Sequence, residues 1–118
     1  MKNLLNLVDQ YELENALEII TEDELIEIAE KLNIETADKL EDLVILIGNE
    51  EVTFYKGFSE DTMIEYIEDE NYGFYFSELP TVIKEHFDFE KFFEDECKGN
   101  ILKISTGFIR MTNELTYL

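Results

Sequence analysis

The chain has 118 residues, of which 29 are Asp or Glu and 9 are Lys or Arg, so its formal net charge is −20 at pH 7. Its length suffices for one compact domain or two small modules that share a core. The hydrophobic content of 45% is ordinary for a folded protein. So negative a molecule repels nucleic acid and attracts basic clefts, including those that normally hold nucleic acid.

The single cysteine, Cys97, excludes an intramolecular disulfide framework and fits a reducing compartment. The opening segment MKNLLNLVDQ has too short an apolar run for a signal peptide. No apolar run approaches the roughly 18 residues of a membrane span. We therefore expect a cytoplasmic protein without a membrane partner.

Aromatic residues divide the chain into two parts. Residues 1–50 contain one aromatic residue, Tyr11, whereas residues 51–118 contain the other 14. The turn signal Gly48-Asn49 lies at the boundary. The pattern predicts an α+β fold, with a small helical bundle in residues 1–48 and a compact α+β module with a short antiparallel sheet in residues 49–118.

The first part is expected to form short amphipathic helices. Apolar residues recur at helical spacing over residues 13–20, 25–32 and 40–47. Thr21 and Glu24 have the spacing of a capping box at the start of the second of these helices. Thr36 is suited to cap the third helix, and Gly48 is suited to end it.

The second part mixes predicted strands and helices. Residues 51–55 (EVTFY) and 74–76 (FYF) are β-branched or aromatic and predict strands. Ser59 is suited to cap a helix over residues 60–70, with Met63, Ile64 and Ile67 directed inward. Further helices are predicted over residues 79–86 and after Asp88, followed by a hairpin that pairs residues 101–104 with 108–111.

Candidate catalytic residues are scarce, and we expect neither an enzyme nor a cofactor. The one histidine, His86, shares helical spacing with Leu79, Val82 and Ile83, which favours partial burial over a role as a base. Cys97 lies on the aromatic face of its predicted helix and is expected to be a small buried residue. The segment Asp69–Gly73 begins like a calcium loop but then departs from that pattern, so no metal site is expected.

The predicted helix over residues 60–70 has an unusually acidic outer face. Asp61, Glu65 and Asp69 are spaced four residues apart, and each such like-charged pair costs about 0.2–0.5 kcal/mol. No Lys or Arg lies between residues 57 and 83 to relieve them. Such a face is often merely solvated. A rigid array of carboxylates can also compete with phosphates for a DNA-binding groove.

The second part also resembles the C-terminal region of ArdA-type antirestriction proteins. The residues that carry the resemblance are Leu79-Pro80, His86-Phe87-Asp88-Phe89-Glu90, Asp95 and Gly107-Phe108-Ile109. Phe87 and Phe89 stand where the family has tyrosines, and Glu94 stands where it has an arginine. The chain has no counterpart of the family's N-terminal β-rich module, so it resembles a shortened form.

The resemblance implies a dimeric mimic of bent duplex DNA, made by a phage or mobile element, that occupies the DNA-binding groove of type I restriction–modification enzymes. A Cas effector is an alternative target, which would make the protein an anti-CRISPR inhibitor. No direct nucleic-acid binding is expected. The acidic residues expected to contact the target are Glu60, Asp61, Glu65, Glu68, Asp69, Glu90, Glu94 and Asp95.

Another hypothesis is an acidic adaptor that binds a partner through an aromatic patch. Its candidate interface residues are Tyr72, Phe74, Tyr75 and Phe76. Self-association as a homodimer is expected from the apolar residues of the second part and from the family. An enzyme that uses Cys97 or His86 is a third, less favoured hypothesis, because no third group is placed to orient the pair.

Overall fold

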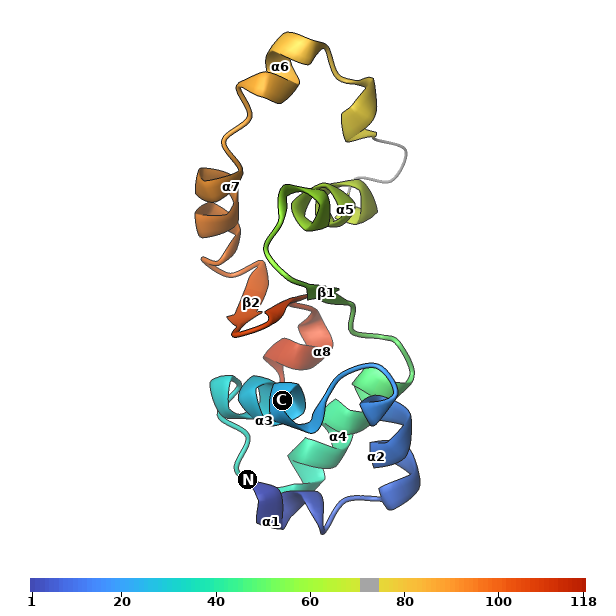
Figure 1. The fold of residues 1–118 in the computed structure, drawn as a ribbon. Helices are drawn as coiled ribbons and strands as arrows, with labels where there is room; N and C mark the ends of the chain where they lie inside the picture. Colours follow the sequence, from blue (N-terminus) through green and yellow to red (C-terminus); the bar gives the residue numbers. More distant parts are fainter. Residues whose placement is uncertain (71–74) are drawn as a thin grey trace.

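The computed structural model describes residues 1–70 and 75–118, which form an elongated α+β rod measuring 53 × 22 × 22 Å. The helices α1–α4 lie at one end, a small sheet lies near the middle, and α5–α7 lie at the other end (Figure 1). The elements in chain order are α1 (Lys2–Leu5), α2 (Gln10–Leu17), α3 (Glu22–Lys31), α4 (Ala37–Gly48), β1 (Phe54–Lys56), α5 (Glu60–Glu70), the 3₁₀ helix η1 (Phe76–Glu78), α6 (Thr81–Glu85), α7 (Phe89–Glu96), β2 (Ile101–Ile104), β3 (Gly107–Arg110) and α8 (Asn113–Thr116).

The sheet is antiparallel, in the order β1-β3-β2. Its side chains alternate between two faces, because successive residues of a strand point in opposite directions. Ile104 and Ile109 face the end that contains α1–α4, whereas Tyr55 and Phe108 face the end that contains α5 and α7. The sheet therefore lies between two apolar clusters.

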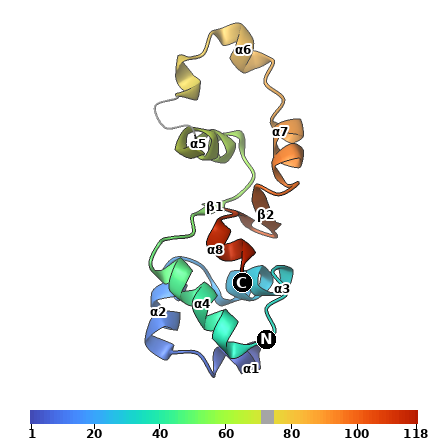
Figure 2. The same ribbon diagram turned by 180° about the vertical axis from the view of Figure 1, so that it is seen from behind.

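The cluster on the first face is aliphatic. It joins residues of α2, α3 and α4 with Val52, Ile104, Ile109 and Leu115. Leu115 belongs to α8, which lies beside the α3–α4 end of the rod when it is viewed from either side (Figures 1 and 2). Residues on both sides of position 48 thus share one core.

The cluster on the second face is aromatic. Tyr55, Met63, Tyr66, Ile101 and Phe108 are buried, and Phe89, Phe92 and Phe93 of α7 pack against them. The Tyr55 and Phe108 rings stack with centroids 5.1 Å apart, and the Tyr66 ring meets the Phe108 ring edge-on at 5.6 Å. Many of the aromatic residues in the second half of the sequence thus form this second core.

The predicted caps of α3 and α4 are confirmed. The Thr21 hydroxyl accepts a hydrogen bond from the Glu24 amide, and Glu24 accepts one from the Thr21 amide, which completes the capping box. The Thr36 hydroxyl accepts a hydrogen bond from the Lys39 amide. These contacts satisfy amides that the first helical turn leaves without partners.

The predicted end of α4 at Gly48 is confirmed, whereas the strand after it requires correction. Gly48 is the last helical residue, and Glu50, with φ of 59°, is a left-handed residue just beyond the helix end. A Cβ at Gly48 would approach the Cβ of Asn15 to 3.2 Å, so glycine there permits close packing on α2. The Glu51 amide donates to the Leu46 carbonyl, which keeps residues 50–51 in the helix end and delays β1 to Phe54.

Three further predictions of local structure were inaccurate. Tyr75 lies outside any strand, and Phe76 begins η1, while residue 74 lies outside the described residues. Strand β3 begins at Gly107, one residue earlier than expected. Helix α6 buries none of its residues, and Val82 and Ile83 are 58% and 48% exposed, because Phe76, Phe87 and Phe89 already pack together beneath this end of the rod.

No helix within residues 1–70 and 75–118 has the length and apolar character needed to cross a membrane.

Candidate functional site

The acidic residues expected to contact a target lie on α5 and α7. Those of α5 are exposed except Glu68, which is half-buried, and those of α7 are all exposed. The two helices pack against each other through the aromatic cluster, since Tyr66 of α5 lies 6.2 Å from Phe92 of α7 between ring centroids. The structure therefore brings the two predicted acidic segments onto neighbouring elements of one end of the rod.

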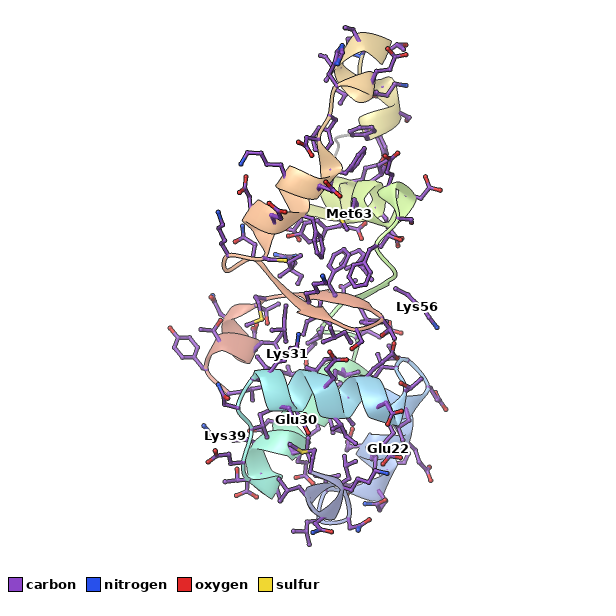
Figure 3. All side chains as sticks on the ribbon, turned by 60° about the vertical axis from the view of Figure 1, so that its left-hand side comes forward. Glu22, Glu30, Lys31, Lys39, Lys56 and Met63 are labelled. Atoms are coloured by element: carbon purple, nitrogen blue, oxygen red, sulfur yellow. The ribbon has the colours of Figure 1, made fainter. Side chains whose placement is uncertain are left out.

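A groove lies between the start of α5, α7 and the edge of the sheet. Its volume is about 470 Å³. We call it the acidic–aromatic groove, and it is lined by four apolar residues, three carboxylates and one lysine: Phe58, Met63, Phe89, Phe93, Glu60, Glu90, Glu94 and Lys103. Met63 can be found between α5 and α7 in Figure 3. Of the predicted acidic residues, Glu60, Glu90 and Glu94 are thus brought together.

Lys103 supplies the positive charge of the acidic–aromatic groove. Its ammonium lies 5.2 Å from the centroid of the Phe58 ring and 5.9 Å from that of Phe93, within range for cation–π attraction. The two rings meet each other edge-on at 5.7 Å. Neither Phe58 nor Lys103 was predicted as a site residue, because the cation–π contact joins a loop to a strand 45 residues further along the chain.

Other predicted acidic residues have partners within the protein. Asp69 accepts a hydrogen bond of 2.8 Å from the Tyr55 hydroxyl, and Glu68 accepts one of 3.2 Å from the Phe76 amide. Asp95 lies 3.7 Å from the Lys91 ammonium and 3.5 Å from that of Lys98. These three carboxylates are therefore partly used for internal contacts, whereas Glu60, Glu90 and Glu94 line the groove.

Two tyrosines at the base of this end of the rod are held in the neutral form. Burial raises the pKa of Tyr55 well above its ordinary value, and the hydrogen bond to Asp69 raises it further. Burial likewise raises the pKa of Tyr66, and the Glu96 carboxylate, which accepts its hydroxyl at 3.2 Å, adds to the effect. Both phenols therefore act as hydrogen-bond donors to acidic side chains.

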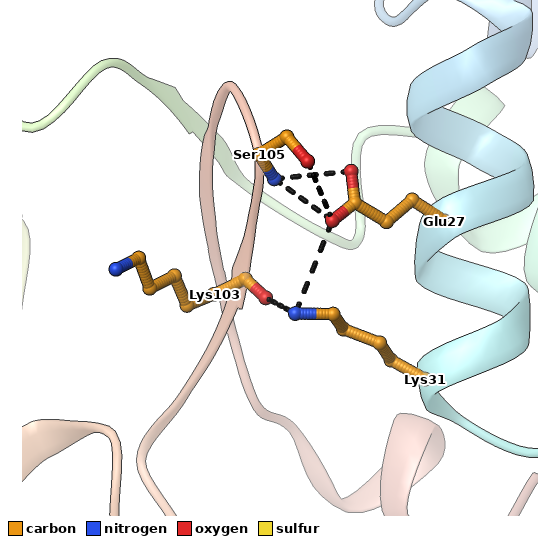
Figure 4. Close-up of polar contacts among 4 residues, drawn as sticks. All are labelled: Glu27, Lys31, Lys103 and Ser105. Carbon is orange, nitrogen blue, oxygen red and sulfur yellow. Dashed lines mark hydrogen bonds and ion pairs between the residues drawn. The ribbon is translucent and has the colours of Figure 1, made fainter.

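Helix α3 fixes the turn of the β2–β3 hairpin through a set of polar contacts that the sequence did not predict (Figure 4). Both oxygens of Glu27 accept the Ser105 amide, at 3.0 and 2.9 Å, and the Ser105 hydroxyl adds a third bond. The Lys31 ammonium donates to the Lys103 carbonyl at 2.6 Å. The Lys103 side chain points away from α3, toward the opposite face of the hairpin (Figure 4).

The aromatic residues proposed as an interface are not equivalent. Tyr75 is 55% exposed, whereas Phe76 is 6% exposed and contacts the rings of Phe87 and Phe89. Tyr72 and Phe74 lie outside the described residues. Phe76 is therefore a packing residue in this fold, and Tyr75, Val82 and Ile83 are exposed apolar residues around it among residues 75–118.

The expected burial of His86 and Cys97 is wrong, since both side chains are exposed. The small part of the Cys97 side chain that is shielded from water nevertheless raises the pKa of its thiol, and the Glu94 and Glu96 carboxylates add to this, although Lys103 opposes them. The two residues flank the eight-residue helix α7, which spans about 12 Å. Their separation gives no support to a Cys–His pair, and a raised pKa reduces the thiolate fraction.

Carboxylates are distributed over the whole rod. Residues 1–59 contain 15 acidic and 4 basic residues, a net charge of −11, and residues 60–118 contain 14 and 5, a net charge of −9. Figure 3 shows side-chain oxygens at both ends, including those of Glu22 and Glu30 on α3. Within residues 1–70 and 75–118, no three His, Cys, Asp or Glu side chains are grouped so as to hold a metal ion.

Comparisons of the chain with protein-family models, with curated proteins and with solved structures found no match.

Proposed function

We propose that the protein is a DNA mimic, which inhibits a nucleic-acid enzyme by occupying its DNA-binding groove. The observation that carries this proposal is the density of negative charge along a narrow rod. Its 29 carboxylates over 53 Å correspond to about one per 1.8 Å, and its net charge of −20 to about one per 2.7 Å. Duplex DNA has one phosphate charge per about 1.7 Å of its axis.

The large net charge destabilises the fold, which supports a function that depends on this charge. Self-repulsion of a large net charge destabilises a compact state, and the four ion pairs seen in the described part of the chain offset little of it because their members are mostly exposed. A groove built to bind phosphates offers lysines and arginines at complementary spacing. Electrostatic attraction between the rod and such a groove is therefore sufficient for inhibition, and no catalytic step is needed.

The target proposed is a type I restriction–modification complex, on the basis of the resemblance to ArdA-type proteins. A Cas effector is the alternative, since its channel for nucleic acid has the same charge. Cleavage assays with the two enzymes in parallel distinguish them. Inhibition of only the restriction complex supports the first target, and inhibition of only the Cas effector supports the second.

The proposed surface can be tested with two variants of equal charge. The first neutralises five exposed carboxylates of α5 and α7, at Glu60, Asp61, Glu65, Glu90 and Glu94, as Gln or Asn. The second neutralises five exposed carboxylates at the other end, at Glu14, Glu18, Glu22, Asp23 and Glu30. Both remove four Glu and one Asp, so a difference between them reports position and not total charge.

We expect the α5–α7 variant to require at least about tenfold more protein for half-maximal inhibition of DNA cleavage, because each lost contact to a basic groove weakens the complex. The control variant should lose less. Unchanged inhibition by both variants would contradict DNA mimicry. Equal losses would contradict the assignment of the main contact surface to α5 and α7.

A second candidate function is that of an acidic adaptor, and the exposed apolar residues Tyr75, Val82 and Ile83 favour it. Such an adaptor would bind its partner mainly by apolar burial, so its affinity would hardly change with salt. Substitution of Val82 and Ile83 by serine would then abolish partner binding. A DNA mimic instead loses affinity steeply as the salt concentration rises.

A further inference from the structure

We propose that the acidic–aromatic groove is the anchor site for an arginine side chain of the partner protein. The inference rests on the proposed function, since basic clefts that hold DNA present arginines, and it names the place where one of them is received. Diffuse attraction between a negative rod and a basic cleft fixes no register. A built cation site can fix one, because its aromatic and carboxylate groups impose a geometry.

The first support is the way in which the fold builds the groove. Alternation along β2 puts Lys103 on the same face of the sheet as its cross-strand partner Phe108, which faces α5 and α7. The contacts of Glu27 and Lys31 hold the backbone of this hairpin on α3 (Figure 4). The strand that forms one wall of the groove is therefore held in place by α3 on its other side.

The second support is the cation that the protein itself places in the groove. The Lys103 ammonium lies over Phe58 and Phe93, and no carboxylate of residues 1–70 or 75–118 lies within 4.0 Å of it. The rings thus attract a cation without help from a direct ion pair. Lys103 is also exposed, so a cation from a partner can displace it.

The third support is the charge that this lysine leaves uncompensated. Glu60, Glu90 and Glu94 line the groove together with one lysine, which leaves two negative charges in excess. The apolar lining of Phe58, Met63, Phe89 and Phe93 excludes water from one side of an incoming group. A ligand that fits must therefore be positively charged and must also have a flat face for the rings.

Arginine meets both requirements better than lysine does. Its guanidinium is planar, stacks on aromatic rings and forms paired hydrogen bonds with a carboxylate, whereas an ammonium is a strongly hydrated point charge. The volume of about 470 Å³ is within the usual range for small-ligand sites, so a single side chain has sufficient space. The chemistry of the site therefore indicates a guanidinium ligand.

The site can be tested with small probes before any target is known. N-acetyl-arginine amide is titrated into the full chain, with N-acetyl-lysine amide and the uncharged N-acetyl-citrulline amide as comparisons. The reporter is the ε-methyl NMR signal of Met63, which lines the groove and is 3% exposed. We expect saturable shifts with arginine in the millimolar range, weaker binding of lysine, and no binding of citrulline.

Three variants test whether binding takes place in this groove. Paired substitution of Glu90 and Glu94 by Gln should weaken arginine binding by about tenfold. The same pair of changes at Glu14 and Glu18 on the opposite end of the rod should leave it within about twofold. Substitution of Lys103 by Met removes the competing ammonium and should tighten arginine binding several-fold.

Equal weakening by the groove pair and the control pair, or no gain from Lys103→Met, would overturn the inference, since binding would then be diffuse ionic attraction. This outcome is independent of DNA mimicry. If Glu90→Gln/Glu94→Gln keeps full inhibition of DNA cleavage but loses the arginine probe, the groove is not an anchor although the proposed function stands. If arginine binds as predicted but the protein inhibits no nucleic-acid enzyme, the proposed function fails and the cation site stands alone.

Discussion

Glu24 is the one buried charged residue in the described part of the chain, with 6% of its surface exposed. Burial alone would raise the pKa of its carboxyl, but hydrogen bonds from Thr106 and from the Thr21 amide outweigh burial and hold the pKa below its ordinary value of 4.5. The same side chain completes the capping box of α3 and contacts the hairpin through the Thr106 hydroxyl. One residue thus connects a helix start to the sheet.

We therefore expect Glu24→Ala to lower the free energy of unfolding by about 1–3 kcal/mol at pH 7, because it leaves the Thr21 amide and the Thr106 hydroxyl without this acceptor. Chemical denaturation monitored by circular dichroism measures the loss. Glu22→Ala, at an exposed position of the same helical turn, is the control. A loss equal to that of the control would contradict the role assigned to Glu24.

The depressed pKa also predicts a pH dependence. A carboxylate with a lower pKa in the folded state contributes stability at pH values above its unfolded pKa and loses that contribution as the pH falls through its folded pKa. The difference in unfolding free energy between the natural chain and Glu24→Gln should therefore be constant from pH 7 to 6 and shrink below about pH 4.5. A difference that stays constant to pH 3 would contradict the depressed pKa.

At the level of elements, the contacts of α3 with the β2–β3 turn predict local protection of the backbone. Glu27→Ala should accelerate hydrogen exchange of the Ser105 amide by about tenfold, since that amide loses both oxygens that accept it. Glu30→Ala, an exposed neighbour on α3 with the same helix propensity change, is the matched control. Unchanged exchange at Ser105 in Glu27→Ala would show that the turn is stable without α3.

We expect the protein to self-associate through the exposed apolar residues of α6, Val82 and Ile83. Two chains of charge −20 repel each other, so apolar contact between them outweighs this repulsion only when salt screens the charge. We expect a dimer at micromolar concentration in about 0.5 M salt and dissociation in low salt, measured by light scattering. Val82→Ser/Ile83→Ser should remain monomeric without losing more than about 0.5 kcal/mol of stability. A monomer at high salt in the natural chain would contradict this prediction.

Sequence patterns identified most elements but not their contacts. Helical spacing and caps indicated α3, α4, α5 and α7, because each has an apolar stripe that packs on a core and a local start signal. The same spacing predicted burial for Val82 and Ile83 and was wrong, since periodicity does not tell whether another element covers a face. The predicted start of the first strand, at residue 51, was too early, because the amides of Glu50 and Glu51 are hydrogen-bonded to the end of α4.

The acidic residues of the candidate site could likewise be predicted from the sequence, whereas their contacts could not. The acidic residues of α5 were identified from the lack of neighbouring lysines along the sequence, which is a local signal, and those of α7 from the motif that resembles ArdA-type proteins. Their grouping depends on contacts between distant parts of the chain: the Tyr66 ring of α5 lies 6.2 Å from the Phe92 ring of α7, and Glu60, Glu90 and Glu94 line one groove. These contacts do not follow from spacing, since they require α5 and α7 to pack together in the folded chain.

At the scale of the whole molecule, the rod has one net negative charge per about 2.7 Å of its length, against one per about 1.7 Å of axis for duplex DNA. The aliphatic cluster, the sheet and the aromatic cluster follow one another along the rod, so the carboxylates are held on a continuous scaffold. This charge per length predicts competition with DNA for one site on the target, which ordinary electrostatic association elsewhere on an enzyme would not produce.

The most direct measurement is displacement of a fluorescent duplex from a type I restriction–modification complex, followed by anisotropy. We predict that the protein releases the duplex fully, at concentrations that rise steeply with salt, and that the variant neutralised at Glu60, Asp61, Glu65, Glu90 and Glu94 needs at least about tenfold more. A duplex that stays bound while the protein saturates the complex would contradict DNA mimicry.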